Sequence, residues 1–226
     1  MNHAVSAASK GDAVKPLHNA STADSYADLP FLPAGGVASA KGFKACGIHA
    51  GFRADPKRLD FALVAADQPA ACAAVFTTNV FCSAPVTVSK EHLDGAGYGI
   101  ARAVAINSGI ANAATGDKGL QTARQSSGIV ADALGCPAQE VLVASTSVIG
   151  QHLQMEPFES GAPLAVSALS AAGGADAAHA IMTTDTKPKE FAVTFSGSGL
   201  GYDGCAFTVG GMAKGSGMIM PNMATM

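Results

Sequence analysis

Short β-prone apolar runs, each bounded by turn residues, constrain the fold of this sequence more than any other feature. The runs cover residues 61–66, 73–77, 85–88, 101–106 and 141–145. Runs of this length, rich in Val, Ile, Phe and Ala and closed by Gly, Pro, Asn or Asp, are typical of strands. We therefore expect a sheet, with several of its strands buried.

Helical periodicity lies between these runs. Residues 120–134 place apolar side chains on one helix face, and Gly135 supplies a stop signal. A second helix is predicted over residues 163–172. Near the C-terminal end, alternating apolar residues at 191–195 and 207–209 predict a hairpin across the Gly-rich turn 196–204. This order predicts a mixed α/β (α+β) fold of packed layers and leaves the strand order open.

Composition sets the broad class of protein. The chain has 226 residues, 48% of them hydrophobic and 14% charged, which is enough for one sizeable core. A net charge of -3 without a Lys/Arg cluster excludes a nucleic-acid partner, and no run approaches the roughly 18 apolar residues of a membrane helix. Residues 1–30 are polar and show no apolar periodicity, so we expect a flexible extension followed by one domain over residues 31–226.

The cysteines and histidines suggest neither disulfides nor a metal. The five cysteines are odd in number and widely spaced, without a CxxC pair: Cys46, Cys72, Cys82, Cys136 and Cys205. None of the six histidines stands at metal-ligand spacing. We expect a cytoplasmic protein with no metal and no bound cofactor.

Candidate chemistry concentrates in the last thirteen residues, KGSGMIMPNMATM. Pro221 followed by Asn222 favours a turn, which would present Ala224 and Thr225 on a bent backbone. The Thr225 hydroxyl can then attack the Ala224 carbonyl, and hydrolysis of the resulting ester releases a chain that begins with Thr225. Its free α-amine, with a pKa of about 7.7 to 8.0, can serve as general base. Residue types alone favour a simpler interpretation, a loop leading into a strand.

Together with NSGIANAATG at 107–116 and IMTTDT at 181–186, this C-terminal run resembles the ornithine acetyltransferase family in sequence, order and spacing. The residues around Gly35 and Gly42 and the run STSVIG at 145–150 extend the resemblance over residues 32–226. It implies the layered sheet-and-helix fold of these self-processing enzymes and a precursor cut between Ala224 and Thr225.

The resemblance also implies an activity. Members of the family move acetyl from N-acetylornithine to glutamate through an acetyl-threonine, here on Thr225, and some also use acetyl-CoA as co-substrate. Thr115 and Gly116 match the oxyanion hole, and Thr183 and Lys214 match substrate-binding positions. Without the resemblance, Thr115–Gly116 is an ordinary turn, Thr183 a strand residue and Lys214 a solvated loop charge. Asp185 is a further polar candidate to which no mechanism assigns a task.

Three positions depart from the usual sequence motifs of the family, NSGNANACTG and STGVIG. Ile110 and Ala114 leave the oxyanion pair unchanged and affect packing alone. Ser147 replaces a common glycine, so the loop around Thr146 must adjust if that position requires a positive φ.

The family also implies a partner. A β chain cut from the same precursor completes the fold, and two α and two β chains assemble. Only Thr225 and Met226 follow the proposed bond here, so we expect this polypeptide alone to be inactive. Two alternatives stay open: an aminopeptidase or amidase in which water attacks the acyl-enzyme, and a binding module without enzymatic activity.

Overall fold

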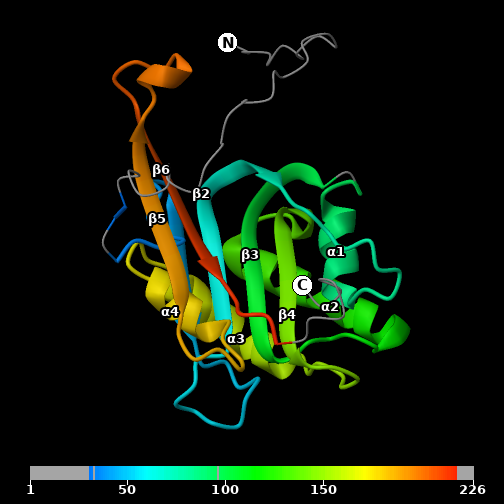
Figure 1. The fold of residues 1–226 in the computed structure, drawn as a ribbon. Coiled ribbons are helices and arrows are strands. Elements are labelled where there is room, and N and C mark those ends of the chain that lie inside the picture. Colours follow the sequence, from blue (N-terminus) through cyan, green and yellow to red (C-terminus); the bar gives the residue numbers. More distant parts are fainter. Residues whose placement is uncertain (1–30, 33, 96, 218–226) are drawn as a thin grey trace.

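The computed structural model describes residues 31–217 except 33 and 96, so the N-terminal residues 1–30 and the Ala224–Thr225 bond lie outside the described part. A four-stranded sheet in the order β1-β2-β3-β4 forms its centre (Figure 1). The strands are β1 Phe43–Ile48, β2 Phe61–Ala73, β3 Tyr98–Ile110 and β4 Val141–Val148. Neighbouring strands are antiparallel except β3 and β4, which are parallel and therefore need a crossover connection.

Helices cover one face of this sheet, which we call the helical face. The helices of the chain are α1 Ala84–His92, α2 Gly116–Leu134, α3 Glu156–Ala168 and α4 Gly174–Ala180. Helices α2 and α3 pack on the helical face, where Val130 and Phe158 meet the fully buried Phe61 and Leu63 of β2. The rings of Phe61 and Phe158 meet edge to face with centroids 5.5 Å apart. This face holds the largest apolar cluster among the described residues.

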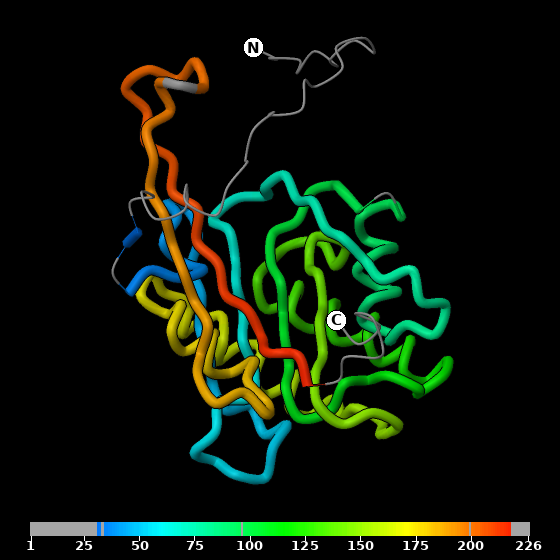
Figure 2. The backbone as a smooth tube through the Cα atoms, viewed as in Figure 1, coloured from blue at the N-terminus to red at the C-terminus, as the bar shows by residue number. Residues whose placement is uncertain are grey.

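The opposite face, which we call the hairpin face, is covered differently. Helix α4 packs there through Ala177 and Ala180 against Ala45 and Ala62. Strands β5 Lys189–Ser196 and β6 Ala206–Ala213 form an antiparallel hairpin, and Met212 of β6 joins the same cluster. Figure 2 shows the end of β6 crossing in front of the sheet toward the lower ends of β3 and β4.

Helix α1 lies along the outer edge of β4. The Ser89 hydroxyl donates to the carbonyl of Val143 (2.8 Å) and accepts from its N–H (2.9 Å), while His92 Nδ1 lies 2.9 Å from the carbonyl oxygen of Val141. Ser89 and His92 share a face because they are three residues apart on a helix, whereas on a strand they would point to opposite sides. The strand predicted at 85–88 is therefore wrong.

The remaining sequence predictions divide clearly. Strands at 61–66, 101–106 and 141–145, the helix at 120–134 and the hairpin are confirmed, and Gly135 adopts the left-handed conformation expected of a helix stop. The strand predicted at 73–77 is wrong, because only Ala73 belongs to a strand, as the last residue of β2. The helix predicted at 163–172 is wrong in extent, because α3 begins seven residues earlier and ends at Ala168. Strand β1 and helix α4 were not predicted. The mixed α/β fold class is confirmed.

Candidate functional site

The first two motif segments, residues 107–116 and 145–150, lie side by side at the carboxyl ends of β3 and β4. Their parallel pairing places Asn107 opposite Ser145, and the Ser145 hydroxyl donates to the Asn107 side-chain oxygen at 2.6 Å. Both side chains are buried. The pairing continues beyond the strands through backbone hydrogen bonds, so the two segments form one connected edge of the site.

The third segment, residues 181–186, is tied to this edge. The Ser108 hydroxyl donates to the carbonyl of Ala180 at 2.7 Å. The guanidinium of Arg53 donates from Nε to Ser108 (3.2 Å) and from Nη2 to the carbonyl of Met182 (2.9 Å). Arg53 comes from the connection between β1 and β2, so it links that connection to two motif segments at once.

The fourth segment, which begins at Lys214, is tied to the third by Asp185. Asp185 Oδ1 accepts from Lys189 Nζ (2.7 Å) and from the N–H of Gly215, and Oδ2 accepts from the N–H of Thr183 (3.1 Å). The Lys214 ammonium lies 3.7 Å from Oδ2. All four motif segments therefore meet at one end of the sheet.

The Asp185 carboxyl group is fully buried. Burial by itself raises its pKa, but the hydrogen bonds from Lys189 and from the N–H groups of Thr183 and Gly215, with the charge of Lys214, outweigh that effect. The net result is a pKa well below the usual range, so Asp185 is a carboxylate at any physiological pH.

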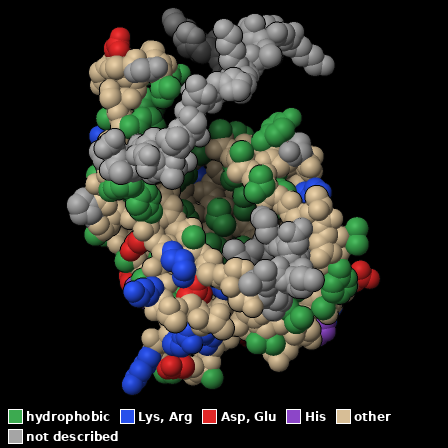
Figure 3. Space-filling model, viewed as in Figure 1, with side chains coloured by type: hydrophobic (Ala, Val, Ile, Leu, Met, Phe, Trp, Pro, Cys, Tyr) green, Lys and Arg blue, Asp and Glu red, His purple; other side chains and the backbone are tan. Residues whose placement is uncertain are grey.

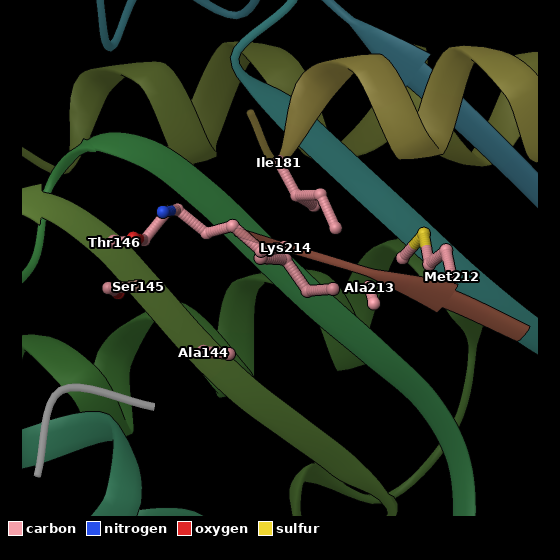
Figure 4. A pocket seen from close by; sticks show the side chains of 8 residues that line it. Ala144, Ser145, Thr146, Ile181, Met212, Ala213 and Lys214 are labelled. Atoms are coloured by element: carbon pink, nitrogen blue, oxygen red, sulfur yellow. The ribbon is translucent and has the colours of Figure 1, made fainter. Parts of the chain in front are cut away.

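A cavity of about 330 Å³ opens on the hairpin face beside these contacts. Its lining is mostly apolar and comes from β3, β4, the end of α4 and the end of β6: Ile106, Ala144, Ser145, Thr146, Ile181, Met212, Ala213 and Lys214. Figure 3 shows the corresponding hollow beside the hairpin, with hydrophobic side chains inside it. In Figure 4 the Lys214 side chain extends toward Thr146. Only 8% of the Lys214 side chain is exposed, so this cation is held within the cavity wall.

Thr115 and Gly116 begin helix α2. The Thr115 hydroxyl donates to the side-chain oxygen of Asn112 at 2.8 Å, and the Asn112 amide donates to the carbonyl of Gly119 at 2.9 Å. Asn112 is fully buried, and in this structure the Thr115 hydroxyl points toward its side-chain oxygen. The predicted oxyanion pair therefore belongs to the edge formed by the first two motif segments, and Thr183 and Lys214 to the network around Asp185.

The backbone from the end of β3 to the first residue of α2 is unusual. Gly109, Asn112, Ala114 and Gly116 all have positive φ, at 128°, 48°, 58° and 59°. Non-glycine residues persist in such conformations only where their surroundings impose them, and they gather at functional sites. The strained backbone is therefore a second, independent indication that this connection has a task beyond joining two elements.

Ser147, one of the three departures from the family pattern named above, has a φ of 111°. The position does require a positive φ, and the serine adopts it. Thr146 stays paired with Ser108 in β4. The backbone at Ser147 takes the strain and the loop around Thr146 keeps its register.

Sequence reasoning assigned no task to three residues that organise the site: Arg53, Asn112 and Asp185. Asn112 and Asp185 lie inside recognised motifs, but their partners are set by the three-dimensional fold. Arg53 gave no signal, since it stands in a connection without a motif. Thr225 and Ala224 lie outside the described residues.

Within the described ranges, no group of three or more His, Cys, Asp and Glu side chains is placed to hold a metal ion. The five cysteines are free thiols. None of the helices described here is both long and apolar enough to cross a membrane.

Comparison with known proteins agrees with this geometry. The model of the ArgJ family matches residues 44–226. Two relatives, each named arginine biosynthesis bifunctional protein ArgJ, come from Geobacter sulfurreducens (48% identical over 186 residues) and Thermosynechococcus vestitus (47% over 192). These alignments cover 82% and 85% of this chain but 45% and 44% of the relatives. The chain thus spans a little under half the length of these curated relatives.

Solved structures give the same result. A crystal structure of ArgJ from Bacillus halodurans has a TM-score of 0.75 at 38% identity, covering 87% of this chain and 98% of that one. The ornithine acetyltransferase from Mycobacterium tuberculosis, crystallised with ornithine, has a TM-score of 0.74 at 40% identity, covering 84% and 96%. With a family model matched over most of its length and the same fold in these structures, the chain belongs to the ArgJ family.

Proposed function

We propose that the full-length protein is a glutamate N-acetyltransferase of arginine biosynthesis that moves acetyl from N-acetylornithine to glutamate. One observation carries the proposal: the four motif segments, distant in sequence, are joined by hydrogen bonds at the ends of β3 and β4, and three of them line one cavity there. The ornithine bound to the Mycobacterium tuberculosis relative supports a substrate of this class.

Thr225 is the proposed nucleophile, freed by cleavage after Ala224. Two coverage figures support a two-chain protein. This sequence accounts for 45% of the Geobacter relative but for 98% of the solved Bacillus chain, so in that structure a comparable segment stands as a separate polypeptide. The proposed partner is the β chain of the same precursor, with two α and two β chains in the assembly.

Thr115 and Gly116 are the proposed oxyanion hole. The Thr115 hydroxyl is held by Asn112 and would turn toward the oxyanion as negative charge develops. The N–H of Gly116 lies in the first turn of α2, where the helix dipole favours negative charge. A hydroxyl and a backbone N–H from adjacent residues are suited to stabilise the tetrahedral intermediate in both half-reactions.

Lys214 and Thr183 are the proposed substrate contacts. Lys214 has three N–H donors; one reaches the Gly215 carbonyl at 3.0 Å, and others can serve a substrate carboxylate. The backbone N–H and C=O of Thr183 are bound by Asp185 and Arg58, so a substrate would meet its side-chain hydroxyl. A cavity of about 330 Å³ is large enough for an acetylated amino acid.

The proposed reaction is a double displacement. Thr225 attacks the acetyl carbonyl of N-acetylornithine, ornithine leaves, and the amine of glutamate takes the acetyl group from acetyl-Thr225. Acetyl-CoA is a proposed second acetyl donor, and no bound cofactor is required. A cytoplasmic location fits this chemistry.

The experiment is intact mass spectrometry of the protein expressed with the coding sequence that follows Met226, beside a Thr225→Ala variant. We expect the wild type to separate into one product ending at Ala224 and another beginning at Thr225, with the variant uncut. The cut protein is then assayed with N-acetylornithine and glutamate. Acetate release without acetylglutamate would indicate the amidase alternative. A wild type that is never cut would exclude the enzyme and favour a binding module.

A further inference from the structure

Asp185 joins the residues before β5 to the chain beyond β6, at the end of the hairpin where the ladder closes with the pair Lys189 and Ala213. Its carboxylate bonds back to Thr183, forward to Lys189 at the start of β5, and across to Gly215 beyond the end of β6. A fully buried carboxylate is costly unless hydrogen bonds and charges compensate it, and here three donors and a second lysine do so. The arrangement therefore extends the hold on the chain after β6 from the last ladder pair, at Ala213, to Gly215.

Gly215 permits this close approach. A Cβ atom built on Gly215 would collide with Asp185 Oδ1 and would lie 3.3 Å from Lys189 Nζ. Gly215 has no positive φ in the structure, so its lack of a side chain is what the site uses. The close contact between Gly215 and the Asp185 carboxylate therefore depends on glycine at position 215.

The two lysines around Asp185 are held differently. Lys189 contacts Oδ1 at 2.7 Å and 45% of its side chain is exposed, so it acts as an external counter-ion. Lys214 lies farther from the carboxylate, at 3.7 Å, and is almost fully enclosed in the cavity wall. At that distance Asp185 orients the ammonium and leaves donors available for a ligand.

We propose that Asp185 is a positioning residue that holds the Lys214 ammonium at the cavity and fixes the chain at Gly215, just beyond β6. The inference rests on the proposed function and deepens it. Gly215 lies ten positions before Thr225 in the sequence. One side chain would thereby hold a substrate contact and the start of the segment that leads to the proposed scissile bond.

The test uses Asp185→Asn in the complete coding sequence. The amide keeps the shape but replaces one acceptor oxygen with a donor and removes the charge. Because hydrogen bonds to charged groups are the strong ones, we expect cleavage to slow about tenfold and KM for N-acetylornithine to rise about tenfold, with kcat changed less. Asp67→Asn is the control, because it removes an exposed 2.9 Å pair with Lys44, and neither residue lines the cavity.

A double variant separates positioning from general stability. If Asp185 acts through Lys214, Asp185→Asn adds little to the KM of Lys214→Met, whereas a structural defect would add its full effect. Should Asp185→Asn fail to fold, Gly215→Ala moves the carboxylate without removing its charge and is expected to raise KM similarly. If the folded Asp185→Asn protein cleaves itself at the normal rate and has a normal KM, this inference is overturned and the proposed function stands. A wild type that neither cuts itself nor transfers acetyl would remove the proposed function, and this inference with it.

Discussion

The two faces of the central sheet are built from the same strands but from different side chains. On the helical face, Phe61 and Leu63 meet Phe158 in a tight aromatic and aliphatic cluster. On the hairpin face, Ala62 and Ala144 leave room for helix α4 and for a cavity that holds a lysine. Because successive strand residues point to opposite faces, one strand can stabilise the fold with one residue and shape a site with the next. Stability and function should therefore respond to different substitutions.

The largest expected effect is on the helical face. Phe61 is fully buried and its ring contacts Phe158, so Phe61→Ala should lower the free energy of unfolding by about 3 to 5 kcal/mol. Denaturant unfolding of the full-length protein measures it. Phe61→Leu, which fills most of the volume, should cost clearly less. If Phe61→Ala lowered the free energy of unfolding by less than about 1 kcal/mol, the helical face would not be the side of the sheet that stabilises the fold.

The second expected effect concerns the strained edge of the site. In the full-length, self-processed protein, Thr115→Val removes the hydroxyl and keeps the shape, so acetyl transfer should slow about 10²- to 10³-fold. The free energy of unfolding should fall by less than for Phe61→Ala, by about 1 to 3 kcal/mol, because the valine leaves the buried Asn112 oxygen without its donor. Thr115→Ser retains the hydroxyl and serves as control. Near-normal turnover of the valine variant would remove Thr115 from the oxyanion hole.

A smaller effect is expected where the cavity is filled. Ala144 lines the cavity floor, and Ala144→Leu should raise KM for N-acetylornithine about tenfold by taking up substrate space. Steady-state kinetics of the full-length protein measure this change, and thermal unfolding should shift far less than for Phe61→Ala. Ala144→Ser, which adds one oxygen, is the control. Unchanged KM in the leucine variant would place the substrate elsewhere.

Sequence reasoning reached the parts of the molecule whose cause is local. The helix before Gly135 and the strand at 101–106 follow from periodicity and turn residues. The run at 85–88 was predicted wrongly because its environment, the edge of β4, is formed by residues more than fifty positions later. Short apolar runs fit strand and buried helix alike, and only tertiary contacts decide between them.

The site shows the same limit. Motif resemblance selected Thr115, Gly116, Thr183 and Lys214, but it gave no reason for Asp185. Its role depends on a hydrogen bond to a residue thirty positions away, across a hairpin. A pattern along the chain identifies residue types suited to chemistry, whereas the residues that hold them in place become visible only in the fold.

The smallest expected effect is a gain of stability at the end of β4. Ser147 has a φ of 111°, a backbone conformation that is strained for a residue with a Cβ atom and almost free of strain for glycine. Ser147→Gly should therefore raise the free energy of unfolding by about 1 kcal/mol. Thermal unfolding should move up by about 2 to 4 °C. Ser147→Ala keeps the Cβ atom and should gain nothing, which separates backbone strain from loss of the hydroxyl. If Ser147→Gly destabilised the protein instead, the conformational entropy that glycine adds to the unfolded state would outweigh the strain that it removes from the folded state. The positive φ at the end of β4 would then carry no net cost in stability. The contrast between a stabilising and a functional side of the sheet would weaken.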